Sequence, residues 1–220
     1  MQEHHCAFEC KGRYYTLGAA PAEASQVWFT LHGYGQLAQY FLNNFKILED
    51  LDILVVAPEG LSRFYLDPLR QNPKSSGDRV GATWMTKEDR LTDIDNYITF
   101  LNAVFHSQPL PPDLPVTIFG FSQGTATATR WVMDGLIRFD RLILWSGIFP
   151  PDIDFRFSGN IFRGKKTSFV YGKQDPYMTT ARLSEMKEIT GKLGFLPQEV
   201  VFDGAHEIDQ PTLLQIAQSR

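Results

Sequence analysis

The stretch Val116-Thr117-Ile118-Phe119-Gly120-Phe121-Ser122-Gln123-Gly124 sets the fold of this chain. Its first four residues are apolar or β-branched, which is typical of a strand buried on both faces. The alanine-containing segment 125–133 has no Gly or Pro and indicates a helix. A strand that turns at once into a helix leaves little space, so Gly120 and Gly124 suit the bend. We therefore expect Ser122 at the bend, in a strained conformation, with its hydroxyl exposed at the carboxyl edge of the sheet.

By itself the G-x-S-x-G pattern at 120–124 is a weak signal, because three fixed positions in five recur by chance. The same residues would also form an ordinary glycine-rich turn in which Ser122 only caps the helix. The rest of the chain distinguishes these two interpretations.

Length and composition indicate an ordinary globular domain. The chain has 220 residues, of which 43% are hydrophobic and 21% charged. A chain of this length buries roughly 70% of its surface on folding, so it needs no disulfide or metal for stability. The net charge is −4, and no basic cluster is longer than Lys165-Lys166. We therefore expect one domain over residues 1–220 that does not bind nucleic acid.

The cysteines and the terminal sequence indicate a reducing compartment. Cys6 and Cys10 are too few for a disulfide framework. Together with His4 and His5 they could hold a metal, but a frayed, exposed N-terminus is the simpler interpretation. The first residues lack the features of a secretory signal, and no apolar run is long enough to span a membrane. We expect a soluble, cytoplasmic protein without stable membrane anchoring, metal or cofactor.

Strand-like and helix-like segments alternate along the chain. Runs typical of buried strands lie at 27–31, 53–57, 116–119, 142–145, 168–171 and 200–202. Helical spacing of apolar residues occurs over 37–48, 91–105 and 183–193, and a further helix is expected near Pro211. This order predicts an α/β domain whose central sheet is mostly parallel and has helices on both faces.

Two segments depart from this alternation. Residues 7–10 and 14–17 flank Lys11-Gly12-Arg13, which predicts a small N-terminal antiparallel hairpin. Residues 61–85 show no clean period and contain Pro68 and Pro73. Such a long irregular stretch usually forms a lid or a pocket wall, and otherwise a surface excursion. We expect it to line a pocket.

Residues with catalytic chemistry follow the predicted strands. The carboxyl ends of parallel strands converge on one crevice, and Ser122, Asp175 and His206 each lie at such an end. A serine hydroxyl needs a base to become nucleophilic, usually an imidazole. The imidazole needs a carboxylate that fixes its tautomer. We therefore expect Ser122 as nucleophile, His206 as base and Asp175 as the carboxylate.

Other histidines and aspartates fit these roles less well. His4 and His5 precede the core, His106 ends a helix, and His32 precedes the glycines of a loop that it would shape by hydrogen bonding. The competitors of Asp175 are Asp152 and Asp154, which come one strand too early, and Asp203, which suits a turn.

Acyl transfer also needs N–H donors for the oxyanion of its tetrahedral intermediate. One is expected from the backbone of Gln123, directly after the nucleophile. The other is expected from the backbone of Tyr34, because Gly33 and Gly35 let the loop after strand 27–31 approach a substrate. The same residues would otherwise form a simple tight turn.

These motifs together resemble a known family. His32-Gly33-Tyr34-Gly35, 120–124, Gly172-Lys173-Gln174-Asp175-Pro176 and Gly204-Ala205-His206 look like the phospholipase/carboxylesterase group of α/β-hydrolases, which includes acyl-protein thioesterases. The resemblance spans roughly residues 27–220. It implies an α/β-hydrolase fold and a cofactor-free enzyme that cleaves small-molecule carboxylic esters or thioesters. The family's triad and oxyanion positions map onto Ser122, Asp175, His206, Tyr34 and Gln123.

Segment 61–85 departs from the proline-rich stretch expected of the family, although its Trp84 resembles a tryptophan near the active site. Family substrates such as lysophospholipids are therefore not carried over. Trp84, Phe149 and Tyr177 are candidate acyl-pocket residues, although aromatic residues of this kind more often belong to a core.

Two other functions fit the same residues. One is hydrolysis of another acyl bond, by an amidase, a dienelactone-type hydrolase or a peptidase. The other is a binding module that keeps the pocket without turnover. The sequence indicates no oligomeric state.

Overall fold

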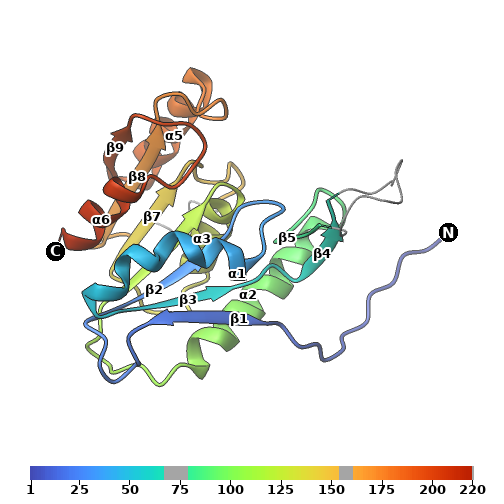
Figure 1. Ribbon diagram of the computed structural model, residues 1–220. Helices are drawn as coiled ribbons and strands as arrows, with labels where there is room; N and C mark the ends of the chain where they lie inside the picture. The colour runs from blue at the N-terminus through green and yellow to red at the C-terminus, as the bar shows by residue number, and fades with distance from the viewer. Residues whose placement is uncertain (67–78, 154–160, 220) are drawn as a thin grey trace, which may run out of the picture.

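The computed structural model describes residues 1–66, 79–153 and 161–219 (Figure 1). Seven strands form the central sheet in the order β1-β3-β2-β6-β7-β8-β9. All neighbouring strands pair in parallel except β1 and β3, which are antiparallel. The prediction of an α/β fold with a mostly parallel sheet is confirmed. The strands are β1 Tyr14–Gly18, β2 Gln26–Leu31, β3 Ile53–Pro58, β6 Val116–Phe121, β7 Arg141–Trp145, β8 Lys166–Gly172 and β9 Gln198–Phe202.

Helices cover both faces of this sheet. The helices are α1 Ala38–Phe41, α2 Arg90–Ser107, α3 Gln123–Asp134, α5 Thr180–Leu193 and α6 Gln210–Gln218. Apolar residues of α2, α3 and α5 pack in one buried cluster with Val27, Phe29 and Leu31 of β2. Residues of α1 and α6 pack in a second cluster with Trp28. Because successive strand residues point to opposite faces, the two clusters are the two sides of the sheet.

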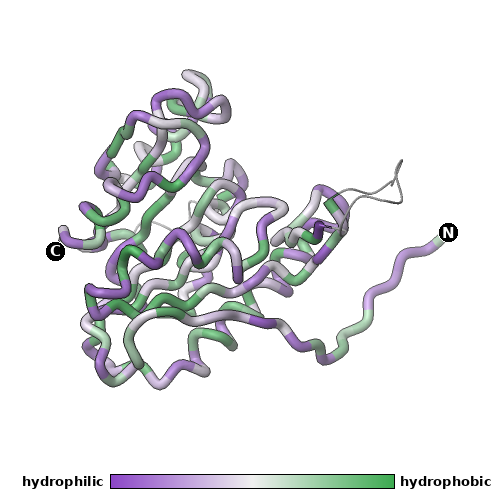
Figure 2. The backbone as a smooth tube through the Cα atoms, in the orientation of Figure 1, coloured by the Kyte–Doolittle hydropathy of each residue, from purple (hydrophilic) through white to green (hydrophobic). Residues whose placement is uncertain are grey.

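Hydropathy follows this layering. Figure 2 shows hydrophobic residues concentrated along the central strands, and the N-terminal arm is largely hydrophilic. Among the described residues, no helix combines the length and the apolar character needed to cross a bilayer.

The predicted N-terminal hairpin is wrong in its pairing. Tyr14–Gly18 forms an antiparallel strand, but its partner is β3, and residues 7–10 are exposed and have no strand structure. An isolated two-stranded hairpin is only marginally stable in water. Pairing with β3 instead lets Tyr15 and Leu17 pack against the second cluster.

The predicted helix over 37–48 has two parts. The short helix α1 continues as a 3₁₀ helix, Leu42–Leu51. Phe41, Phe45 and Leu48 are buried, as the apolar spacing predicted. The 3₁₀ part ends at Asp52, which has a left-handed conformation with φ of 52°.

The described parts of segment 61–85 form a separate antiparallel pair, β4 Ser62–Tyr65 and β5 Val80–Thr83. Figure 1 shows this pair apart from the central sheet. Residues 67–78, which include Pro68 and Pro73, lie outside the described residues.

The glycine at the start of α3 yields a prediction about stability. A Cβ at position 124 would lie 2.2 Å from Leu31 O, which is backbone and cannot rotate away. We expect Gly124→Ala to lower the free energy of unfolding by about 1–3 kcal/mol or more, measured by denaturant unfolding. Gly191→Ala in α5 is the control, because a Cβ there meets nothing within 4 Å. That variant should gain about 0.5–1 kcal/mol, and equal effects at both positions would contradict the packing argument.

Candidate active site

Ser122 lies on a sharp turn between β6 and α3. Its φ of 54° and ψ of −116° are rare for a residue other than glycine. A Cβ at Gly120 would lie 2.3 Å from Gly124 O, so the turn has no space for a side chain there. The Ser122 amide donates to Trp145 O at 2.8 Å and joins the turn to β7. This conformation costs about 1–3 kcal/mol, which the surrounding backbone contacts offset.

The structure brings Ser122, His206 and Asp175 into one hydrogen-bonded chain. His206 Nε2 lies 2.9 Å from Ser122 Oγ, and His206 Nδ1 lies 2.8 Å from Asp175 Oδ2. The other carboxylate oxygen, Oδ1, accepts from Tyr177 N at 2.9 Å. Since an ionised carboxylate only accepts, Nδ1 carries the proton and Nε2 is available to accept from the serine hydroxyl.

The two backbone amides expected to bind an oxyanion have no acceptor among the described residues. Gln123 is the first residue of α3, and an N–H at this position has no intrahelical partner. In the loop after β2, the amides of Gly33, Gly35 and Gln36 donate to Gln36 Oε1, Ala82 O and Gly33 O. The amide of Tyr34 is left over.

His32 shapes this loop from within the core. Gly60 N donates to His32 Nε2 at 2.9 Å, and His32 Nδ1 donates to Gly33 O at 2.7 Å. Burial lowers the pKa of His32 to about 4, so the ring is neutral. Both ring nitrogens are hydrogen-bonded to the backbone, so His32 shapes the loop as its position in the sequence predicts.

Residues of segment 61–85 support the same region. Gly35 N donates to Ala82 O at 2.8 Å, and Ala82 N donates to Gln36 O at 3.2 Å. A Cβ at Gly81 would lie 2.4 Å from Gly35 O, so β5 packs directly against the loop. The Gln123 side chain donates to Met85 O at 2.9 Å, which connects the segment to α3.

Glu59 also supports this loop, a role that was not predicted from the sequence. Its side chain is buried and accepts from Arg13 Nε at 2.7 Å, Arg63 Nη1 at 3.1 Å and Ala38 N at 3.1 Å. It thereby joins the end of β3 to the start of α1. A carboxylate directly after a buried strand, in Pro58-Glu59-Gly60, was the available signal.

A cleft of about 860 Å³ contains Ser122 and His206. Phe149 and Tyr177 line it, and the Tyr177 ring lies edge-on to His206 with centroids 4.7 Å apart. Trp84 is not among the described residues that line the cleft. It is 1% exposed and stacks on His32 with ring centroids 4.9 Å apart, so its neighbour Met85 lines the cleft instead.

The competing aspartates have other partners. Asp152 binds two arginines, as described below, and Asp203 Oδ1 accepts from Gln174 Nε2 at 2.7 Å. Within the described residues, the His206 ring is hydrogen-bonded to Asp175 and Ser122 and not to these two aspartates. Asp154 lies outside the described residues.

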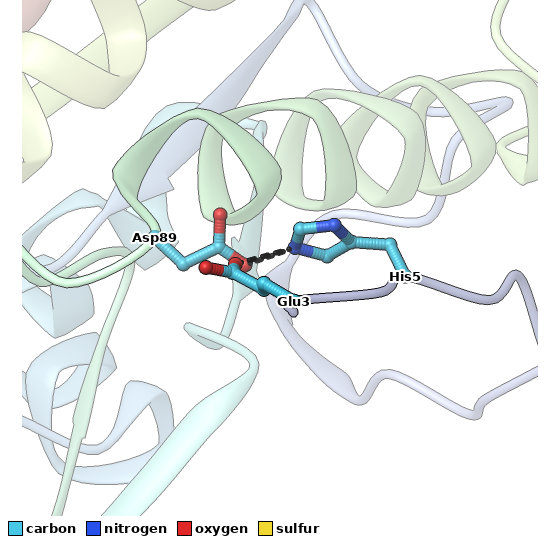
Figure 3. A group of neighbouring side chains, drawn as sticks. All are labelled: Glu3, His5 and Asp89. Atoms are coloured by element: carbon cyan, nitrogen blue, oxygen red, sulfur yellow. Dashed lines mark hydrogen bonds and ion pairs between the residues drawn. The ribbon is translucent and has the colours of Figure 1, made fainter. Parts of the chain in front are cut away.

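Figure 3 shows the group of side chains that could hold a metal ion: Glu3, His5 and Asp89. His5 Nε2 lies 3.0 Å from Asp89 Oδ2 and 3.3 Å from Glu3 Oε1. All three residues are exposed, and exposed acidic groups are common without a metal. The free cysteines Cys6 and Cys10 are also exposed and are not part of this group.

Comparisons with known proteins place this geometry in context. Residues 18–219 match the family described as Phospholipase/Carboxylesterase. No curated protein matches the chain. Among solved structures, acyl-protein thioesterase 2 of Zea mays is 16% identical, with a TM-score of 0.67, over 94% of this chain and 97% of that chain. A carboxylesterase from Mesorhizobium loti is 17% identical, with a TM-score of 0.67, over 94% and 93%. A phospholipase/carboxylesterase from Dyadobacter fermentans is 17% identical, with a TM-score of 0.64, over 98% and 99%.

The buried neutral His32 predicts a specific pH dependence. Its folded pKa of about 4 lies below the ordinary value of 6.5, so between these values the unfolded chain binds the extra proton. His32 therefore stabilises the fold above pH 6.5, and this contribution falls as pH drops towards 4. We expect the difference in unfolding free energy between the parent and His32→Asn to shrink by about 3 kcal/mol from neutral to acidic pH. A difference that does not change with pH would contradict a neutral buried ring.

Proposed function

The chain belongs to the Phospholipase/Carboxylesterase family, and from this premise we propose that it hydrolyses carboxylic ester or thioester bonds through Ser122, His206 and Asp175. The observation that carries the proposal is the continuous hydrogen-bonded chain from Ser122 Oγ through His206 to Asp175 Oδ2. Each residue has the chemistry and the contact that its role requires.

In the first half-reaction, Ser122 Oγ attacks the substrate carbonyl carbon while His206 Nε2 takes the hydroxyl proton. The carbonyl oxygen becomes an oxyanion, which accepts hydrogen bonds from the amides of Tyr34 and Gln123. The imidazolium formed on His206 is stabilised by the ionised Asp175. Collapse of the intermediate breaks the bond to the alcohol or thiol, and His206 returns the proton to this leaving group.

In the second half-reaction, water attacks the acyl-enzyme. His206 Nε2 takes a proton from the water as the new bond to the acyl carbon forms. The second tetrahedral intermediate then expels Ser122 Oγ, which regains a proton from His206. The carboxylic acid leaves and the site returns to its starting state.

We also propose a cytoplasmic location. Its support is that Cys6 and Cys10 carry free, exposed thiols, which persist in reducing compartments.

Removing the nucleophile should abolish turnover. We expect Ser122→Ala to lower kcat for a p-nitrophenyl ester by roughly 10⁶-fold. A fluorophosphonate probe should label the parent on Ser122, as mapped by peptide mass. Ser146→Ala is the matched control, because Ser146 also follows a strand and also has a φ of 54°. In this variant the probe should still label Ser122. Full esterase activity in Ser122→Ala would refute the proposal.

The choice of carboxylate can be tested with a matched pair of aspartates at neighbouring strand ends. Asp175→Asn replaces the group that holds the His206 tautomer and should lower kcat by roughly 10⁴-fold. Asp203→Asn changes an exposed carboxylate that binds Gln174 and should turn over ester about as fast as the parent. A large loss of kcat in Asp203→Asn with little loss in Asp175→Asn would show that Asp203, and not Asp175, is the carboxylate that supports His206.

A further inference from the structure

The cleft that holds Ser122 carries a different charge from the chain as a whole. Its charged lining residues are three arginines and two carboxylates, namely Arg90, Arg130, Arg182, Asp152 and Glu185. The chain has a net charge of −4. Positive charge in excess is therefore gathered in the cleft of an acidic protein, where it acts on whatever binds there.

Arg130 lies on α3, the helix that begins directly after Ser122. Ala126 and Arg130 follow Ser122 by four and eight residues and also line the cleft, so all three share one side of the helix. At 1.5 Å per residue, the Arg130 backbone lies about 12 Å from Ser122. A substrate whose carbonyl lies at Ser122 Oγ can therefore extend within the same cleft towards Arg130.

Asp152 binds both neighbouring arginines and neutralises only one. Arg130 Nη2 lies 2.7 Å from Asp152 Oδ1, and Arg90 Nη1 lies 2.6 Å from Oδ2. Burial opposes ionisation of Asp152, but hydrogen bonds from Arg130 and Arg90 outweigh it and lower its pKa. The carboxylate is therefore ionised, and the group of three side chains carries one net positive charge.

Arg130 also has donors to offer. Its side chain is 12% exposed, and its Nη1 points at Met85 Sδ at 3.6 Å. A thioether is a weak acceptor, whereas a guanidinium carries five N–H donors in a planar arrangement that fits an oxyanion. An anionic group in the cleft would be a much stronger partner than Met85.

We propose that the preferred substrates are esters or thioesters that carry an anionic group, a carboxylate or a phosphate, at the far end from the scissile bond, and that Arg130 binds this group. The inference rests on the proposed function and narrows its substrate class. Asp152 bridges Arg130 and Arg90 and offsets one of their two positive charges at the cleft wall, whereas the contact with the anion comes from Arg130 itself.

A purely structural bridge between α2, α3 and the segment after β7 is the alternative. It would account for the contacts with Asp152. It would not require the excess positive charge in the cleft or the shared side of α3 with Ser122. The two explanations differ in what happens when the bridge is broken without removal of positive charge.

The test compares the p-nitrophenyl half-ester of suberic acid with its neutral methyl ester analogue. The parent should have a higher kcat/KM for the charged ester than for the neutral ester. The ratio of these two kcat/KM values should fall as the salt concentration is raised. In Arg130→Met this ratio should fall by about 10- to 100-fold. Arg130→Lys should retain part of the preference. If Arg130→Met does not fold, Arg130→Gln and the salt dependence of the parent provide the same comparison.

Two controls separate binding from structure. Asp152→Asn breaks the bridge but leaves both arginines, so the preference for the charged ester should persist or rise, and its loss would favour the structural explanation. Lys187→Met removes a positive charge from α5 outside the cleft and should leave the ratio at the parent value. Equal kcat/KM for both esters in the parent would overturn this inference and leave the proposed function intact.

A binding measurement makes the inference independent of turnover. Calorimetric titration of Ser122→Ala with monomethyl suberate and with octyl phosphate should show binding, and adding Arg130→Met to this variant should weaken it. The ligand that binds more tightly shows whether the site prefers a carboxylate or a phosphate. Dimethyl suberate should bind less tightly than monomethyl suberate. Equal binding of these two suberates would overturn the anion preference, whereas failure of the parent to hydrolyse either p-nitrophenyl ester would overturn the proposed function instead.

Discussion

The geometry of the candidate active site depends on the close approach of backbone segments at the turn around Ser122. Gly120 packs on Gly124 O, Gly124 packs on Leu31 O, and Gly147 packs on Ser122 O, each at a distance that a Cβ would make impossible. Three neighbouring strands therefore meet α3 at one point. Ser122 takes its positive φ at this crowded point, and its hydroxyl lies within hydrogen-bond distance of His206. The first amide of α3 has no acceptor in the part of the chain that the structure describes.

Two histidines show how environment decides what one side chain can do. His32 is fully buried, with a backbone partner on each nitrogen and a strongly lowered pKa, so its ring can only hold a loop in place. His206 has a side chain that is 22% exposed and lies between a carboxylate and a hydroxyl. Its partners can exchange a proton with it, whereas an amide and a carbonyl cannot.

The irregular segment before α2 has a structural purpose at its described end. Strand β5 is hydrogen-bonded to the loop that presents the Tyr34 amide, and Met85 O accepts from the Gln123 side chain. The two amides that would face an oxyanion are thus held by one stretch of chain. Such rigid support is what preorganised donors require, because their benefit depends on their not reorienting during the reaction.

The sequence by itself determined the alternation of strands and helices, the bend at Ser122 and the order Ser122, Asp175, His206. These follow from local periodicity, from glycine sterics and from the rule that parallel strand ends share one edge. Only the tertiary structure decided that β1 pairs with β3, that Trp84 faces His32 rather than the cleft, and that Arg90 and Arg130 meet at Asp152. The physical reason is that each of these contacts joins segments far apart in the chain, and their geometry depends on how whole layers pack, which no local pattern encodes.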